Sequence, residues 1–160
     1  MRTELLLGIV LIAVIGGALL LVESGSNSNV SASSDAVLID QNERTNDEGA
    51  VTIALSYMDP SQSSEYGDEI AFDTTINTHS SDISQYQLDK LSYLVDSSGN
   101  KYTPSGWVES EGSGGHHRKG VLLFSESDDS GAEILSNGKY FEIIVKDVDG
   151  IPKRTFRWDI

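Results

Sequence analysis

Residues 51–57 read Val-Thr-Ile-Ala-Leu-Ser-Tyr, and large apolar side chains alternate along them with small or polar ones. This period of two is typical of a β-strand with one buried face. Residues 70–76, Ile-Ala-Phe-Asp-Thr-Thr-Ile, repeat the pattern. We therefore expect two strands here, each with one face turned to a core.

The segment after these strands predicts a hairpin. Residues 88–95 are apolar enough for a strand, although Leu88, Leu91 and Leu94 also fit a short helix. Residues 96–100, Asp-Ser-Ser-Gly-Asn, form a strong turn signal, and residues 101–103 read as the returning arm.

Three further strands are expected in the last forty or so residues. They are residues 120–124, 140–145 and 156–160, and Asp149-Gly150 predicts a hairpin turn before the last of them. About seven short strands in residues 50–160 predict an all-β domain, an antiparallel β-sandwich with Ig-like topology. A small barrel is the alternative. The final strand should tie the end of the chain into a sheet.

The N-terminal region has a different composition. Residues 5–22 are uncharged and apolar on every side, and at about 1.5 Å per residue they nearly span a bilayer core. We interpret residues 5–22 as a single transmembrane signal anchor after a cytoplasmic segment, residues 1–4. The alternative is a cleaved signal peptide, with a cleavage site at Val30-Ser31-Ala32 and a secreted product.

Residues 23–49 follow as a polar linker rich in serine and asparagine. Arg2 precedes the apolar run, and the next basic residue is Arg44. Because cytoplasmic flanks carry the positive charges, residues 50–160 are expected on the extracytoplasmic side of the cell membrane, with membrane lipid in contact with residues 5–22.

The charge of the chain restricts its partners. The 160 residues contain 25 acidic and 11 basic side chains, which gives a net charge of −14. Nucleic acid is excluded as a partner because its phosphates would be repelled, while basic proteins and cations remain. The absence of cysteine excludes disulfides, zinc ribbons, iron–sulfur clusters and thiol nucleophiles.

The three histidines lie in two short motifs. His79 belongs to Thr-His-Ser at the end of a predicted strand, and His116 and His117 belong to Gly-Gly-His-His-Arg in a glycine-rich loop. Imidazoles bind copper and zinc, so three that converge would form a metal site, with Asp82, Glu109 or Glu111 as an oxygen ligand.

A structural interpretation competes with the metal site. In it, His79 bonds the backbone of a turn, and the glycine-rich loop closes a sheet end, with Arg118 bound to a carboxylate and Trp107 as further support. The acidic stretches 126–129 and 147–150 could likewise bind calcium, but they lack EF-hand spacing and fit a solvated surface better.

The two histidine motifs also carry a resemblance. They flank an Asp96-x-x-Gly99 turn that is followed by Tyr102, Pro104 and Trp107, and the second motif continues as Gly120-Val121-Leu122-x-Phe124. The series, over residues 50–160, resembles a family of exported or membrane-anchored prokaryotic Ig-like proteins with no established activity. The resemblance implies an Ig-like fold and an extracytoplasmic location.

The sequence contains no motif typical of nucleotide-binding proteins, zinc-dependent hydrolases or serine hydrolases. The expected function is that of a non-enzymatic binding module with an unknown protein partner, such as an accessory subunit of an envelope assembly. Two alternatives remain, a histidine-based copper or zinc binding protein and a type IV pilin-like filament subunit, since pilins also join an apolar N-terminal helix to a β-rich head.

Overall fold

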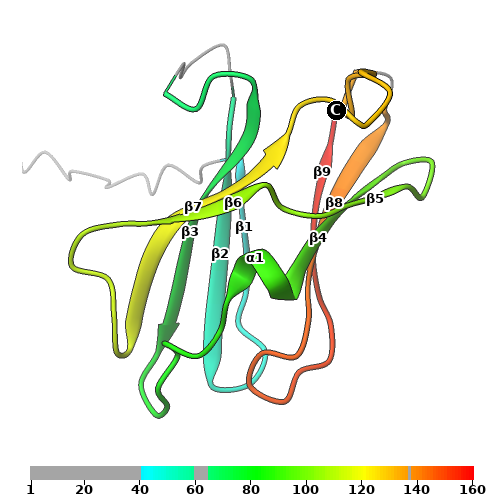
Figure 1. The fold of residues 1–160 in the computed structure, drawn as a ribbon. Coiled ribbons are helices and arrows are strands. Elements are labelled where there is room, and N and C mark those ends of the chain that lie inside the picture. Colours follow the sequence, from blue (N-terminus) through cyan, green and yellow to red (C-terminus); the bar gives the residue numbers. More distant parts are fainter. Residues whose placement is uncertain (1–40, 60–64, 137) are drawn as a thin grey trace, which may run out of the picture. The chain divides into compact units, whose positions relative to one another are not determined.

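The computed structural model describes residues 41–59, 65–136 and 138–160. These residues form two antiparallel sheets packed as a β-sandwich (Figure 1). A five-stranded sheet has the order β1-β2-β3-β7-β6, and a four-stranded sheet has the order β5-β4-β8-β9. The strands are β1 (Glu43–Asn46), β2 (Val51–Met58), β3 (Glu69–Thr78), β4 (Ser92–Asp96), β5 (Lys101–Tyr102), β6 (Gly106–Glu109), β7 (His117–Ser125), β8 (Tyr140–Val145) and β9 (Arg154–Asp159).

The predicted sandwich is confirmed, and most predicted strands are present. In β2, Val51, Ile53 and Leu55 are completely buried, as the alternation requires. The described residues contain nine strands, two more than expected, because β1 and β6 were not predicted. β1 lies inside the range 23–49 that the sequence assigns to a linker, so the sheet begins before residue 50.

One predicted strand is shorter than expected. Residues 88–91 form a single helical turn, α1 (Leu88–Leu91), and β4 begins only at Ser92. The strand prediction is therefore wrong for these four residues. The turn forms because Leu88 and Leu91 can then face the core together, and the Ser92 hydroxyl donates to the Leu88 carbonyl where the helix ends.

The expected turns are present. Asp149 and Gly150 both have positive φ, 53° and 71°, and the Ile151 amide donates to the Val148 carbonyl, so they form a tight turn of type I′. The end of the chain is also held as predicted, because the Ile160 amide donates to the Lys139 carbonyl.

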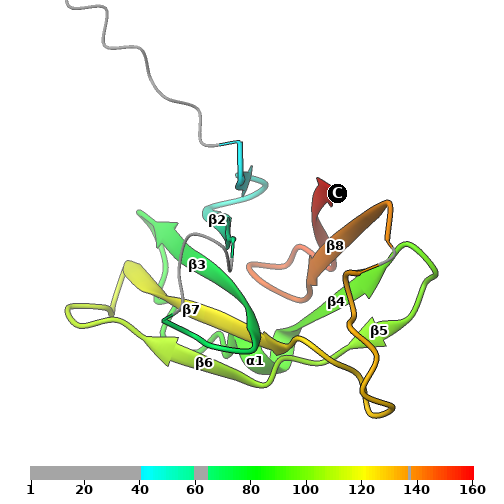
Figure 2. The ribbon, with the colours of Figure 1, turned by 90° about the horizontal axis from the view of Figure 1, so that it is seen from above.

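The core lies between the two sheets and centres on aromatic rings. Phe141 and Trp158 of the four-stranded sheet stack with ring centroids 5.2 Å apart, and Phe72 of the opposite sheet contacts both. At one side of the sandwich β1 contacts β9, and at the other α1 contacts β4 and β6. Figure 2 shows the two layers, with α1 where β6 and β4 approach each other.

No helix within the described ranges is long and apolar enough to cross a membrane. The predicted span at residues 5–22, the segment before it and the linker as far as residue 40 lie outside the described residues.

Candidate functional site

The two histidine motifs meet across one strand pair. β3 and β7 are antiparallel, and their register places Asn77 opposite His117. Thr78, at the end of β3, donates its amide to the His116 carbonyl, so the Thr-His-Ser segment lies beside the glycine-rich loop. The sequence could not predict this contact, because it depends on a register between segments about forty residues apart.

Two of the three imidazoles come together. The ring centroids of His79 and His117 are 6.3 Å apart, at an interplanar angle of 80°. His116 points elsewhere, and its Nδ1 lies 2.8 Å from the Ser81 carbonyl oxygen. Within the described residues, no group of three or more His, Cys, Asp or Glu side chains is arranged to hold a metal ion.

Two of the three oxygen ligands considered for a metal are bound by other groups, and the third, Glu111, is exposed in the loop before β7. Asp82 accepts hydrogen bonds from the amide and the hydroxyl of Ser84. Glu109 is bound by Arg118 through both of its carboxylate oxygens. Copper or zinc binding by all three histidines therefore stays a prediction, and the described geometry offers only the pair His79 and His117.

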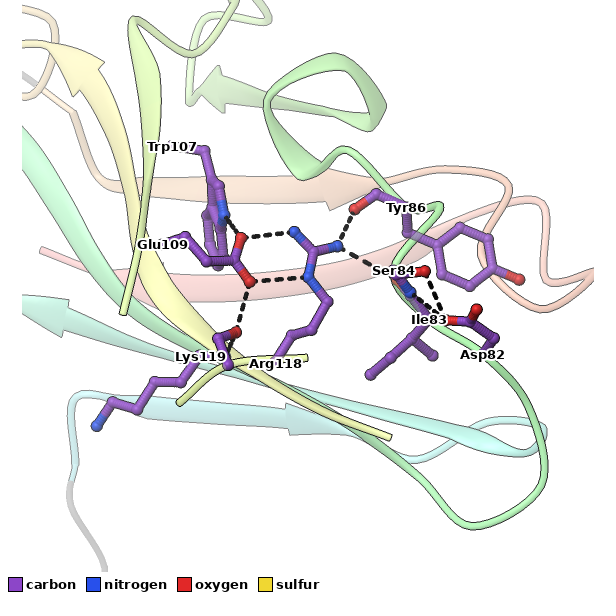
Figure 3. A network of polar contacts seen from close by, with 9 residues as sticks. Asp82, Ile83, Ser84, Tyr86, Trp107, Glu109, Arg118 and Lys119 are labelled. Carbon is purple, nitrogen blue, oxygen red and sulfur yellow. Dashed lines mark hydrogen bonds and ion pairs between the residues drawn. The ribbon is translucent and has the colours of Figure 1, made fainter. Parts of the chain in front are cut away.

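Arg118 forms the most connected polar network near these motifs (Figure 3). Its side chain is 9% exposed, and its Nε and Nη2 donate to Glu109 at 3.0 and 2.7 Å. Its Nη1 donates to the carbonyls of Ile83 and Tyr86. One guanidinium thus joins β7 to β6 and to the segment that leads into α1.

Glu109 accepts more than the arginine. Trp107 Nε1 and the Ser113 hydroxyl also donate to its carboxylate. The hydrogen bonds from Arg118, and after them those from Ser113 and Trp107, lower the pKa of Glu109 to about 2 despite partial burial. The Trp107 ring also lies 5.7 Å from the guanidinium carbon of Arg118. The structural interpretation of the glycine-rich loop expects Arg118 to bind a carboxylate, with Trp107 as support. The contacts of Arg118 and Trp107 with Glu109 are of this kind.

The acidic stretches considered for calcium mostly form turns. Asp128 Oδ1 accepts the amides of Ser130 and Ala132, which closes its loop. Asp149 Oδ2 accepts the Ala50 amide and so joins the β8–β9 turn to the start of β2.

A groove that the sequence did not indicate lies at the other end of β7. Its volume is about 560 Å³. One side consists of β5 and the residues that follow it, and the other side is the connection from β7 to β8. Figure 2 shows that connection running beside β5. Most of the side chains that line the groove carry a hydroxyl or a carboxylate group. The lining residues are Lys101, Tyr102, Thr103, Pro104, Ser105, Ser125, Ser127, Asp128, Asp129, Ser130 and Ile134.

Several polar groups of the groove have no partner in the part of the chain that the structure describes. Ser105 and Tyr102 are bound to Glu69 and Asp96. The side chains of Thr103, Ser127 and Asp129, by contrast, make no hydrogen bond or ion pair with other described residues. The lining segments are separated in sequence, which explains why no motif predicted the groove.

No protein-family model, curated protein or solved structure matches this chain.

Proposed function

We propose that the chain is a membrane-tethered, extracytoplasmic binding module without catalytic activity, and that its groove receives a cationic group of a protein partner. The apolar run at residues 5–22 supports the tether, and the weakly positive N-terminal end supports the orientation. The observation that carries the binding function is the polar groove with its unpartnered side chains.

An Ig-like topology and membership of the resembled family are part of the same proposal. β3 pairs with β7 and β4 pairs with β8, so the chain passes between the sheets as Greek-key connections do. The two signature motifs of the family also meet across β3 and β7, which supports reading them as one structural unit.

Charge selects the class of ligand. Asp128 and Asp129 line the groove together with Lys101, and the Lys101 ammonium lies over the Tyr93 ring at 5.1 Å. Hydrogen bonds from Ser130 lower the pKa of Asp128, so this carboxylate is charged at neutral pH. The net charge of −14 adds a field that attracts cations. A lysine or arginine side chain of a partner fits these conditions.

The test uses the full chain in detergent micelles and a blocked peptide that contains one arginine. The matched probe is the same peptide with citrulline, which keeps the shape and removes the charge. We expect the arginine peptide alone to shift the NMR amide signals of residues 101–105 and 127–130. Asp129→Asn should weaken its binding about two- to fivefold, the size of one exposed ion pair.

Glu111→Gln is the control, because Glu111 is exposed and lies in the loop at the opposite end of β7. It should leave peptide binding unchanged. Equal shifts with both peptides, shifts confined to other regions, or equal effects of Asp129→Asn and Glu111→Gln would overturn the proposed role of the groove.

A further inference from the structure

His79 and His117 lie on the outer face of the five-stranded sheet. His117 is opposite Asn77 in the β3–β7 register, and His79 follows Asn77 by two residues, so both imidazoles project from the same face. Thr78, which lies between Asn77 and His79 in the sequence, projects to the opposite side, into the core, and is 2% exposed. Both imidazoles are accessible from solvent.

The contact with Asn77 favours one tautomer of His117. Its Nδ1 lies 2.9 Å from the Asn77 side-chain oxygen, which can only accept a hydrogen bond. The neutral ring must therefore carry its proton on Nδ1, and Nε2 keeps a free lone pair. Metal-binding histidines are typically held in this way, with the second nitrogen donating to an oxygen.

The geometry points to His79 and His117 as a two-imidazole site for a divalent transition-metal ion, with Cu²⁺ as the best-fitting ion. Imidazole nitrogens suit copper, nickel and zinc, and affinity for a given nitrogen site is greatest for Cu²⁺. The remaining coordination positions would be taken by water, since no third such ligand lies in place among the described residues.

The separation of the rings is compatible with this ion. Two imidazoles that share a metal at about 2.0–2.1 Å from each nitrogen have ring centres roughly 4.5 Å apart when the angle at the metal is 90° and roughly 6.5 Å apart when it is 180°. The present 6.3 Å lies within this range, and two exposed side chains can adjust inside it. The neighbouring Lys119 on this face is paired with Asp73 at 3.1 Å, so its charge is partly balanced.

This inference is independent of the proposed function. His117 is at the start of β7 and His79 follows the adjacent end of β3, whereas the groove is at the end of β7, where Ser125 lines it. Loss of one site should therefore leave the other intact.

The test measures Cu²⁺ binding to the full chain, which is prepared without any added histidine residues. Calorimetry gives the affinity, and electron paramagnetic resonance identifies the ligands. We expect one ion bound through two imidazole nitrogens. His79→Ala and His117→Ala should each weaken binding at least tenfold. Both residues are exposed, so the variants should keep the melting temperature of the parent protein.

His116→Ala is the matched control, because it removes a neighbouring imidazole that is directed to Ser81 instead. It should leave the affinity and the spectrum unchanged. Asn77→Ala should weaken binding up to about tenfold, through loss of the oriented tautomer. Binding no tighter than millimolar, retention of Cu²⁺ by the double variant of His79 and His117, or an equal loss with His116→Ala would overturn the assignment.

Discussion

Arg118 and Arg154 are two buried arginines with different partners, and the Nε of Arg154 has no hydrogen-bond partner among the described residues. Arg118 has a carboxylate partner, Glu109. Arg154 is 1% exposed and donates to Asn46 and to the carbonyls of Val51 and Val148, without a direct ion pair among the described residues. Its pKa is lowered by burial, whereas the pKa of Arg118 is raised by Glu109. The Arg118 network should therefore depend on pH through its carboxylate.

Glu109→Gln should destabilise the protein in a pH-dependent manner. The folded-state pKa of Glu109 is near 2, below its usual 4.5, so the stabilisation is complete above about pH 4.5 and is lost as the pH falls toward 2. Its side chain is 39% exposed, so solvent screens the ion pair and we expect a loss of about 1 kcal/mol at pH 7.

Urea unfolding of both proteins from pH 7 to pH 2 measures this difference, which should shrink as the pH falls. Glu111→Gln is the control and should stay within about 0.5 kcal/mol of the parent at each pH. A difference between parent and Glu109→Gln that is constant over the whole range would show that the carboxylate acts through shape alone.

Gly120 is a second residue whose identity the packing dictates. A Cβ built on it would lie 2.5 Å from a ring carbon of Trp107 and 2.5 Å from the Val108 carbonyl oxygen. Gly120→Ala should therefore displace β6 and cost about 1–3 kcal/mol. Gly106→Ala, on β6 itself, has no atom within 4 Å of the added carbon and should leave the melting temperature nearly unchanged. Equal effects of the two variants would contradict this packing argument.

At the scale of elements, alternation predicted strands well wherever one face is buried. β2, β3 and β9 were predicted from alternation, and their large apolar residues face the core. β1 and β6 lie at the two edges of their sheet and have few buried side chains, so the sequence Glu-Arg-Thr-Asn of β1 carries no period of two. Leu88 and Leu91 fit both a strand and a helical turn, and only the core could decide between them.

The candidate sites were less predictable than the strands. The residue types of the histidine motifs were visible in the sequence, but pairing of His79 with His117 depends on the β3–β7 register. The structural interpretation required a carboxylate for Arg118, yet it could not select Glu109 from so many acidic residues. Local patterns contain no information on which distant segments meet.

β1 provides a test of the domain boundary. Arg44 donates to the Arg157 carbonyl at 2.7 Å, Trp158 donates to the Asn42 carbonyl, and Arg154 donates to Asn46, so this short strand fastens both sheets. A fragment of residues 50–160 loses these bonds and leaves Arg154 with fewer acceptors.

We expect the 50–160 fragment to melt roughly 10 °C below a fragment of residues 41–160, since a loss of about 2–3 kcal/mol shifts the midpoint of a domain this size by about 8–13 °C. Thermal unfolding followed by circular dichroism compares the two. Equal melting temperatures would show that β1 does not contribute to the stability of the sandwich.

At the scale of the whole molecule, the excess of acidic residues destabilises the folded state through self-repulsion. The net charge is −14, and of the described acids Asp73, Asp89, Glu109, Glu142 and Asp159 form ion pairs with basic side chains, which balance only part of this charge. Screening by salt should reduce this repulsion, because the Debye length falls from about 30 Å at 0.01 M to about 10 Å at 0.1 M.

We therefore expect the melting temperature at pH 7 to rise steeply between 0.01 and 0.1 M NaCl and to level off above that range. Exclusion of salt from the protein surface would instead raise it steadily to much higher concentrations. Calorimetry near pH 4.3, the isoelectric point of the sequence, is the control, because the net repulsion vanishes there. If the rise persists at that pH with the same size, surface exclusion accounts for it, and self-repulsion does not limit the stability of this fold.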